Sequence, residues 1–127
     1  MNLEKVIFAF FIVLALTINF GFFIGDIDNP DHHNVYELYA ALVISLIATV
    51  LKFGDRTHIG AVLLATSLVA DVQLIIAAVI WGMVEHVTHT GMTPHVMAAI
   101  VSLSGGALLA NITSVVLFVI ETAMMRR

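Results

Sequence analysis

The sequence contains no cysteine and little charge. None of its 127 residues is Cys, and only 11% are Asp, Glu, Lys or Arg. The missing thiols exclude disulfides, thiolate metal sites and cysteine nucleophiles. The low charged fraction is untypical of a soluble domain, in which about 25% of residues are charged. The formal net charge is −4, so we expect no nucleic-acid partner.

Long hydrophobic stretches occupy most of the chain, and 61% of its residues are hydrophobic. About 20 apolar residues in a helix cross a hydrocarbon core roughly 30 Å thick. The pattern predicts an all-α membrane protein with one transmembrane domain over residues 1–127. The expected membrane-spanning helices form an antiparallel bundle and cover about residues 6–25, 35–51, 58–84 and 94–125.

Two of these helices begin with recognisable capping residues. Asn34 and Glu37 have the spacing of a capping box, in which Glu37 reaches back to the Asn34 amide. Thr93 precedes Pro94, so threonine is expected to cap the last helix and proline to occupy its first turn.

The charged residues are segregated by sign. All the basic residues fall where a four-pass chain returns to one side of the bilayer, at Lys5, Lys52, Arg56, Arg126 and Arg127. The opposite connections carry only acidic charges, at Asp26, Asp28, Asp31, Glu37 and Glu85. Because cytoplasmic loops are enriched in Lys and Arg, both termini are predicted to be cytoplasmic. The expected location is the cell inner membrane, with the lipid bilayer in contact with the bundle.

Asp71 is an acidic residue in the middle of an apolar helix. A carboxylate at this depth is costly unless it is protonated, partnered or exposed to water, so it is a candidate functional group. Depth counted along the helices places Asn19 and Asn111 in the same layer, and Tyr39 and Gln73 close to it. We expect the two amides to donate hydrogen bonds to Asp71. The cluster is then either a cation or proton site or a contact that fixes helix register.

The last helix carries a stripe of small residues at four-residue steps, namely Ser102, Gly106, Ala110 and Ser114. Small residues allow close approach of a second helix in a membrane. The stripe therefore packs either against another helix of the same chain or against a second copy.

Histidines cluster on the acidic side. Glu85 and His89 are four residues apart, and His86 and His89 three apart, so an α-helix would place them on one face. Together with neighbouring groups they offer nitrogen and oxygen ligands for zinc, copper or nickel. The additional candidate ligands are His32, His33, His95 and Asp28. The alternative is a solvated acidic rim that binds no metal.

The hairpin segment 38–74 resembles a known family. Its most distinctive parts are Lys52-Phe-Gly-Asp-Arg-Thr57 and Ala65-Thr-Ser-Leu-Val-Ala-Asp71. It is similar to a family of short bacterial four-helix inner-membrane proteins of unknown function, over most of the chain. The resemblance implies a link to potassium channel or uptake systems and supplies no catalytic residue. No T-V-G-Y-G selectivity sequence is present, so we do not expect a conventional potassium pore.

Two functional hypotheses follow. In the first, the chain is a small membrane subunit of an ion-conducting or transport assembly for a cation such as potassium. It would act as a homo-oligomer or beside a larger membrane-protein partner, and no cofactor other than the bound ion is needed. In the second, it binds or senses a divalent metal through the outer His and Asp residues. We expect no enzymatic activity, because no nucleophile, base and orienting group occur at usable spacing.

Overall fold

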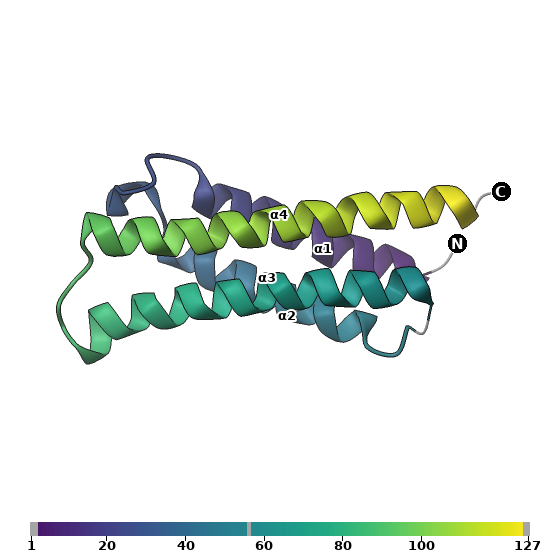
Figure 1. Cartoon of the computed structure of the whole chain (residues 1–127), viewed down its shortest axis with the longest axis horizontal. Helices are drawn as coiled ribbons and strands as arrows, with labels where there is room; N and C mark the ends of the chain where they lie inside the picture. Colours follow the sequence, from purple (N-terminus) through teal and green to yellow (C-terminus); the bar gives the residue numbers. More distant parts are fainter. Residues whose placement is uncertain (1–2, 56, 126–127) are drawn as a thin grey trace.

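The computed structural model describes residues 3–55 and 57–125. Within these ranges it contains helices and no strands, which confirms the predicted fold class. Its four long helices (Figure 1) are α1 (Leu3–Phe23), α2 (Val35–Lys52), α3 (His58–Gly82) and α4 (Pro94–Met125). Two short elements complete the described chain, the 3-10 helix η1 (Pro30–His32) and the π-helical turn η2 (Met83–Val87).

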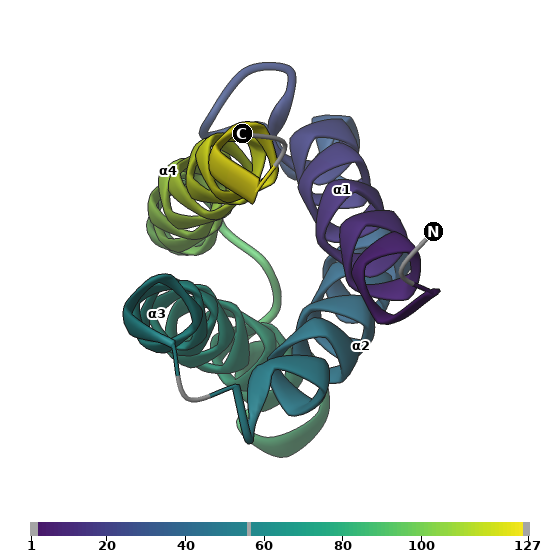
Figure 2. The same cartoon turned by 90° about the vertical axis from the view of Figure 1, so that its right-hand side faces the viewer.

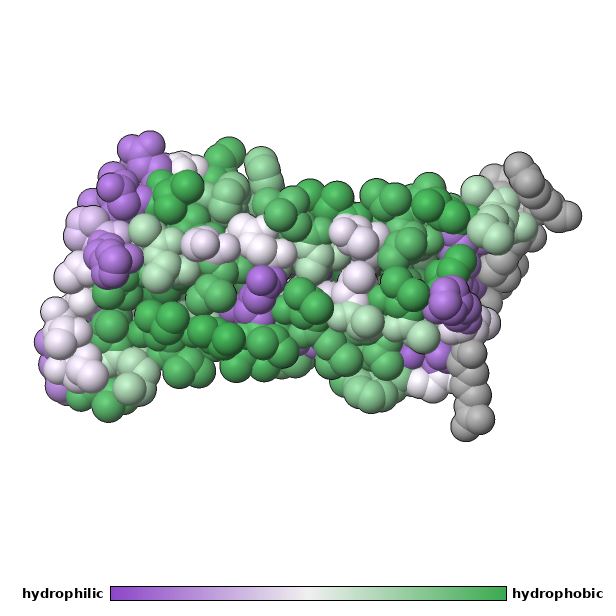
Figure 3. All heavy atoms as spheres, in the orientation of Figure 1, coloured by the Kyte–Doolittle hydropathy of each residue, from purple (hydrophilic) through white to green (hydrophobic). Residues whose placement is uncertain are grey.

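Each of the four long helices is long and apolar enough to cross a membrane. Figure 3 shows a broad hydrophobic band between two more polar ends, interrupted by a small hydrophilic patch where α3 and α4 meet. This surface is that of a multi-pass membrane protein, because water would expose the apolar band and a bilayer covers it.

The helices form an antiparallel ring. Seen end-on (Figure 2), α1, α2, α3 and α4 follow one another around the bundle, so that α1 lies diagonally opposite α3. Both termini and the α2–α3 turn lie at one end, here called the terminal end. The α1–α2 and α3–α4 connections lie at the other, here called the loop end. Three residues that supported the cytoplasmic placement of the termini, Arg56, Arg126 and Arg127, lie outside the described residues.

The predicted caps are confirmed in part. Asn34 Oδ1 accepts from the Tyr36 amide at 2.8 Å, and Thr93 Oγ1 accepts from the Val96 amide at 3.2 Å. The second half of the capping box is wrong, because the Glu37 carboxylate lies against Gly21 of α1 instead. Gly21 has no Cβ, and the space that it leaves admits this side chain.

The α2–α3 turn is built by a compact set of polar residues. Gly54 has φ +97°, a conformation that glycine adopts at little cost. Asp55 Oδ1 accepts from the Thr57 amide at 3.0 Å and from the Thr57 hydroxyl at 2.7 Å. Thr57 Oγ1 in turn accepts from the Gly60 amide at 2.9 Å and caps α3. A Cβ on Gly60 would collide with the Asp55 carboxyl group.

The Asp55 turn predicts a specific pH dependence of stability. Hydrogen bonds from the Thr57 hydroxyl and then the Thr57 amide hold the pKa of Asp55 below its ordinary value of 3.8. The carboxylate form is therefore favoured by folding, and its contribution is full above the unfolded pKa and disappears as the pH falls through the folded pKa. Asp55→Asn should lower the unfolding temperature near neutral pH, and the difference from wild type should shrink below about pH 4.

Thermal unfolding in detergent between pH 7 and pH 3 measures this effect. Asp28→Asn, which changes an exposed acid of the loop end, is the matched control and should follow the wild-type curve. Equal pH profiles for Asp55→Asn and wild type would contradict the assigned role of the turn.

Candidate functional site

Asp71 faces the inside of the bundle. Its residue is only 3% exposed, in the middle of α3. Its Oδ1 accepts from Ser45 Oγ at 2.7 Å, and its Oδ2 accepts from Thr49 Oγ1 at 2.5 Å. Both hydroxyls belong to α2, where a spacing of four residues places them on one helix face. The carboxyl group is therefore held against α2 and kept away from lipid.

Within the described residues, no charged partner compensates Asp71. Among residues 3–55 and 57–125, no basic side chain forms an ion pair with it. An ionised carboxylate buried without a counter-charge costs several kcal/mol. A bound cation or a proton on the carboxyl group would remove this cost.

Asn19 does not contact Asp71, and the prediction that it would is wrong. Its Nδ2 donates to the Ser104 carbonyl at 3.0 Å, and its Oδ1 accepts from Ser104 Oγ at 2.6 Å. The physical reason is the ring order of the helices, which places α1 diagonally opposite α3 and beside α4. Asn19 and Ser104 together fix the register of α1 against α4.

Asn111 lies inside the bundle without a hydrogen-bond partner. It is fully buried, and neither its Nδ2 nor its Oδ1 makes a hydrogen bond among the described residues. The expected hydrogen bond to Asp71 is therefore not formed. Contacts of Thr66 with Ser114, and of Gln73 with Gly106, set the level of α3 against α4. At 1.5 Å rise per residue they place Asn111 within about one turn of the level of Asp71.

Ser67 adds another unpartnered group at the same level. It is fully buried one turn from Asp71 on α3, and its Oγ has no hydrogen-bond partner in the described chain. Buried polar groups without partners are uncommon and typically indicate a ligand, an ion or water. Asp71, Ser67 and Asn111 therefore define the candidate site, together with the hydroxyls of Ser45 and Thr49.

Apolar side chains close the candidate site on both sides. Toward the terminal end lies a cluster here called the apolar plug, which consists of Phe8, Ile12 and Leu63, together with Ala48 at the level of Thr49. Toward the loop end lies a larger apolar core that includes Phe22, Leu38, Leu74 and Ile100. The polar layer is therefore enclosed, and its low-dielectric surroundings strengthen the electrostatic interactions within it.

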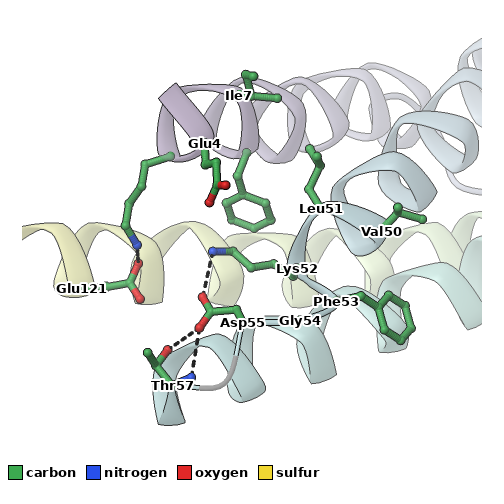
Figure 4. A pocket seen from close by; sticks show the side chains of 12 residues that line it. Glu4, Ile7, Val50, Leu51, Lys52, Phe53, Gly54, Asp55, Thr57 and Glu121 are labelled. Carbon is green, nitrogen blue, oxygen red and sulfur yellow. Dashed lines mark hydrogen bonds and ion pairs between the residues drawn. The ribbon is translucent and has the colours of Figure 1, made fainter. Parts of the chain in front are cut away.

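A charged pocket opens at the terminal end (Figure 4). It has a volume of about 730 Å³, and Lys5 and Glu121 form an ion pair of 2.5 Å beside it. Lys52 Nζ lies 3.4 Å from Asp55 Oδ2 and 4.4 Å from the centroid of the Phe8 ring. Phe8 belongs to the apolar plug, so the pocket ends where the plug begins.

Tyr39 and Gln73 take structural positions away from the carboxyl group. Tyr39 donates its hydroxyl proton to the Ala78 carbonyl at 2.9 Å, about two turns from Asp71 along α3. Gln73 lies against Gly106 of α4, because positions 71 and 73 point to opposite sides of a helix. Neither residue forms a hydrogen bond with Asp71, and Gln73 Oε1 is buried without a hydrogen-bond partner within the described residues.

The expected metal site is not assembled. Within the described residues, which include every histidine, no three His, Asp or Glu side chains form a group that could hold a metal ion. His33 instead places Nδ1 2.5 Å from the Phe22 carbonyl and Nε2 2.7 Å from the Asp26 carbonyl. His32 Nδ1 accepts from the Asp26 amide at 2.9 Å. Both rings therefore fix the backbone of the α1–α2 connection.

The other predicted ligands are separated by the shape of the chain. The segment after α3 is a π-helix, and His89 has φ +55°. The four-residue spacing of Glu85 and His89 would give a shared face only in an α-helix. His95 and Asp28 are exposed and do not join them.

Three of the four residues in the small-residue stripe of α4 pack within the chain. Gly106 lies beneath Gln73 of α3, and the Ser114 hydroxyl is 2.5 Å from the Thr66 hydroxyl of α3. Ala110 packs against the larger apolar core, and Ser102 is exposed. The stripe therefore serves the α3–α4 contact, so Gly106 and Ser114 are not free for a second copy.

Ser45 and Thr49 are the site residues that the sequence reasoning missed. A signal was present, because two hydroxyl residues four apart lie on the helix that a short turn joins to the Asp71 helix.

The chain matches the Family of unknown function (DUF6394) over residues 32–122, and it belongs to this family. No curated protein and no solved structure matches it. The matched range includes Asp71, Ser45, Thr49 and Asn111, whereas Asn19 lies outside it. The family description names no activity, so the geometry of the bundle must carry the functional argument.

The Asn19–Ser104 contact predicts a measurable coupling. Asn19→Ala and Ser104→Ala each leave a buried polar group unpaired, so the double variant should lose less stability than the sum of the single variants. The expected coupling is about 0.6–1.7 kcal/mol, the range for polar contacts between membrane helices.

Unfolding in mixed micelles measures the coupling, with Asn19→Ala and Thr113→Ala as a control cycle. Thr113 is exposed and bonds to its own helix. A coupling near zero for Asn19 and Ser104 would contradict the contact.

Proposed function

We propose that this member of the DUF6394 family is a membrane subunit of an ion-transport assembly that binds a monovalent cation or a proton at Asp71. The observation that carries the proposal is the enclosed carboxyl group with oxygen ligands from α2 and no counter-charge among the described residues. Ser67 and Asn111 lie at the same level, and their polar atoms have no partner within the described residues. They add further possible ligands for an ion bound at Asp71.

The chemistry of the donors supports this class of ligand. Carboxylate, hydroxyl and amide oxygens suit hard cations, whereas no sulfur or imidazole ligand lies in the layer. An intramembrane acid that faces a bundle interior is typical of ion and proton pathways. Potassium, sodium and the proton are the candidate ions, and potassium is the one that the sequence resemblance implies.

The charged pocket supplies a route from one side. An ion entering at the terminal end meets Glu4 and the Lys52–Asp55 pair before it reaches the apolar plug. Passage beyond the plug requires rearrangement of the bundle, which a second copy or a larger partner would promote. Because α3 already covers Gly106 and Ser114, such a partner would contact other parts of the surface.

The divalent-metal hypothesis has less support. Its candidate ligands are dispersed or bonded to backbone within the described chain. We therefore retain ion transport as the proposed function, in the cell inner membrane and with the terminal end in the cytoplasm.

The first test is ion flux. Asp71→Asn removes the charge and keeps the shape, so flux of the transported ion in reconstituted liposomes should fall roughly tenfold or more, since the variant loses a site worth several kcal/mol. Potassium, sodium and proton fluxes are measured separately. Asp28→Asn changes an exposed acid outside the bundle and should retain wild-type flux. Unchanged flux with reduced stability for Asp71→Asn would show that Asp71 only fixes helix packing.

The second test is orientation. The chain has no cysteine, so His58→Cys at the terminal end and His95→Cys at the loop end each introduce a single thiol at an exposed position. In intact cells, a membrane-impermeant maleimide should label His95→Cys and leave His58→Cys unlabelled until the membrane is opened. The reverse pattern would overturn the proposed orientation.

A further inference from the structure

The hydroxyl of Thr49 has more acceptors than protons. Its Oγ1 lies 2.5 Å from Asp71 Oδ2 and 3.0 Å from the Ser45 carbonyl oxygen. A hydroxyl carries one proton and can serve only one of these oxygens at full strength. If Asp71 is ionised, the single hydroxyl proton of Thr49 serves only one of these two oxygens. The other oxygen–oxygen contact then has no proton between its two atoms.

A proton on Asp71 Oδ2 satisfies every group in this contact. Ser45 Oγ then donates to Oδ1 at 2.7 Å, Oδ2–H donates to Thr49 Oγ1, and Thr49 Oγ1–H donates to the Ser45 carbonyl. We infer that Asp71 is a proton-exchange site, occupied as a neutral acid in this arrangement. The inference rests on the proposed ion-binding role and names its ion as the proton.

Release of the proton requires one small movement. The O–H bond of Oδ2 breaks, the proton passes to a water molecule, and the bonding electrons stay on the carboxylate. The Thr49 hydroxyl then turns its proton from the Ser45 carbonyl to Oδ2. That carbonyl keeps the hydrogen bond that it accepts in the helix. The two states differ by one proton and one hydroxyl rotation, which makes Thr49 a two-position element.

Lys52 is the charged residue of α2 nearest to the Asp71 site on this helix face. Ser45, Thr49 and Lys52 are all buried and share this face. The Lys52 ammonium, however, points to Asp55 and lies over the ring of Phe8, which belongs to the apolar plug. It therefore does not replace the proton as the counter-charge of Asp71.

The remaining helices bring no charge to the carboxyl group. On α4, Asn111 lies near the level of the site and does not titrate, and Glu121 is paired with Lys5 at the terminal end. From α1, diagonally opposite, the charged residues Glu4 and Lys5 also lie at the terminal end. Within the described residues, a proton is thus the simplest way to keep Asp71 uncharged in an enclosed layer.

The chain offers matched variants for this inference. Asp71→Asn reproduces the neutral pattern, because its amide oxygen accepts from Ser45 and its NH₂ group donates to Thr49. Ser45→Ala removes only the donor to Oδ1, which is the carbonyl oxygen of the neutral acid. Thr49→Ser keeps the hydroxyl and serves as the conservative control.

Infrared spectroscopy of the full chain in lipid bilayers at neutral pH tests the inference. The wild-type minus Asp71→Asn spectrum should contain the C=O stretch of a protonated carboxylic acid. The band should shift to lower wavenumber in D₂O and to higher wavenumber in Ser45→Ala, which loses the hydrogen bond to that oxygen. Thr49→Ser should leave it in place. The Ser45→Ala comparison assigns the band even if Asp71→Asn fails to insert.

Two results would overturn the inference. Absence of a carboxylic acid band attributable to Asp71 at neutral pH would show that the group is ionised. A band that D₂O does not shift would show that the proton does not exchange. Presence of the band, together with unchanged flux in Asp71→Asn, would support protonation of Asp71 and reject its role in transport. Loss of flux without the band would reject the proton and support a metal cation.

Discussion

The fold of this chain is constrained by one carboxyl group that has to be kept out of lipid. Asp71 satisfies this constraint through two hydroxyls on α2, so α2 and α3 have to stay in contact at this level. The short turn between these helices makes that contact local in sequence, so the chain closes it at little entropic cost. The α1–α4 side is fixed separately, by Asn19 and Ser104. Polar contacts at mid-bundle depth therefore set the register of α2 against α3 and of α1 against α4.

Much of the fold could be predicted from the sequence because its signals are local. Hydrophobic length gives the four helices, and Asn34 and Thr93 mark two of their starts. The partners of Asp71 could not be obtained by counting depth along the helices. That count assumes parallel axes and says nothing of which helices are neighbours, and the ring order placed Asn19 on the diagonal. The histidine hypothesis failed for a related reason, since residue spacing implies a shared face only where the helix is an α-helix.

The turn between α2 and α3 gives a structural meaning to the most distinctive sequence segment. Gly54, Asp55, Thr57 and Gly60 each have a definite role in reversing the chain and starting α3. This segment therefore needs no catalytic explanation. In contrast, no requirement of the backbone explains an acid at position 71, where an amide or an alanine would pack in a helix equally well. Asp71 is therefore the candidate functional residue, and the α2–α3 turn has a structural role.

The apolar plug has a kinetic consequence. Phe8, Ile12 and Leu63 are almost completely buried, and displacing such side chains requires collective motion of packed helices, which takes microseconds to milliseconds. The enclosed site would then connect to the charged pocket at the terminal end only during rare collective motions of the helices. Under the proposed transport function, an isolated copy would therefore conduct as a carrier with discrete openings, far more slowly than an open channel, and a partner that loosens the plug would accelerate it.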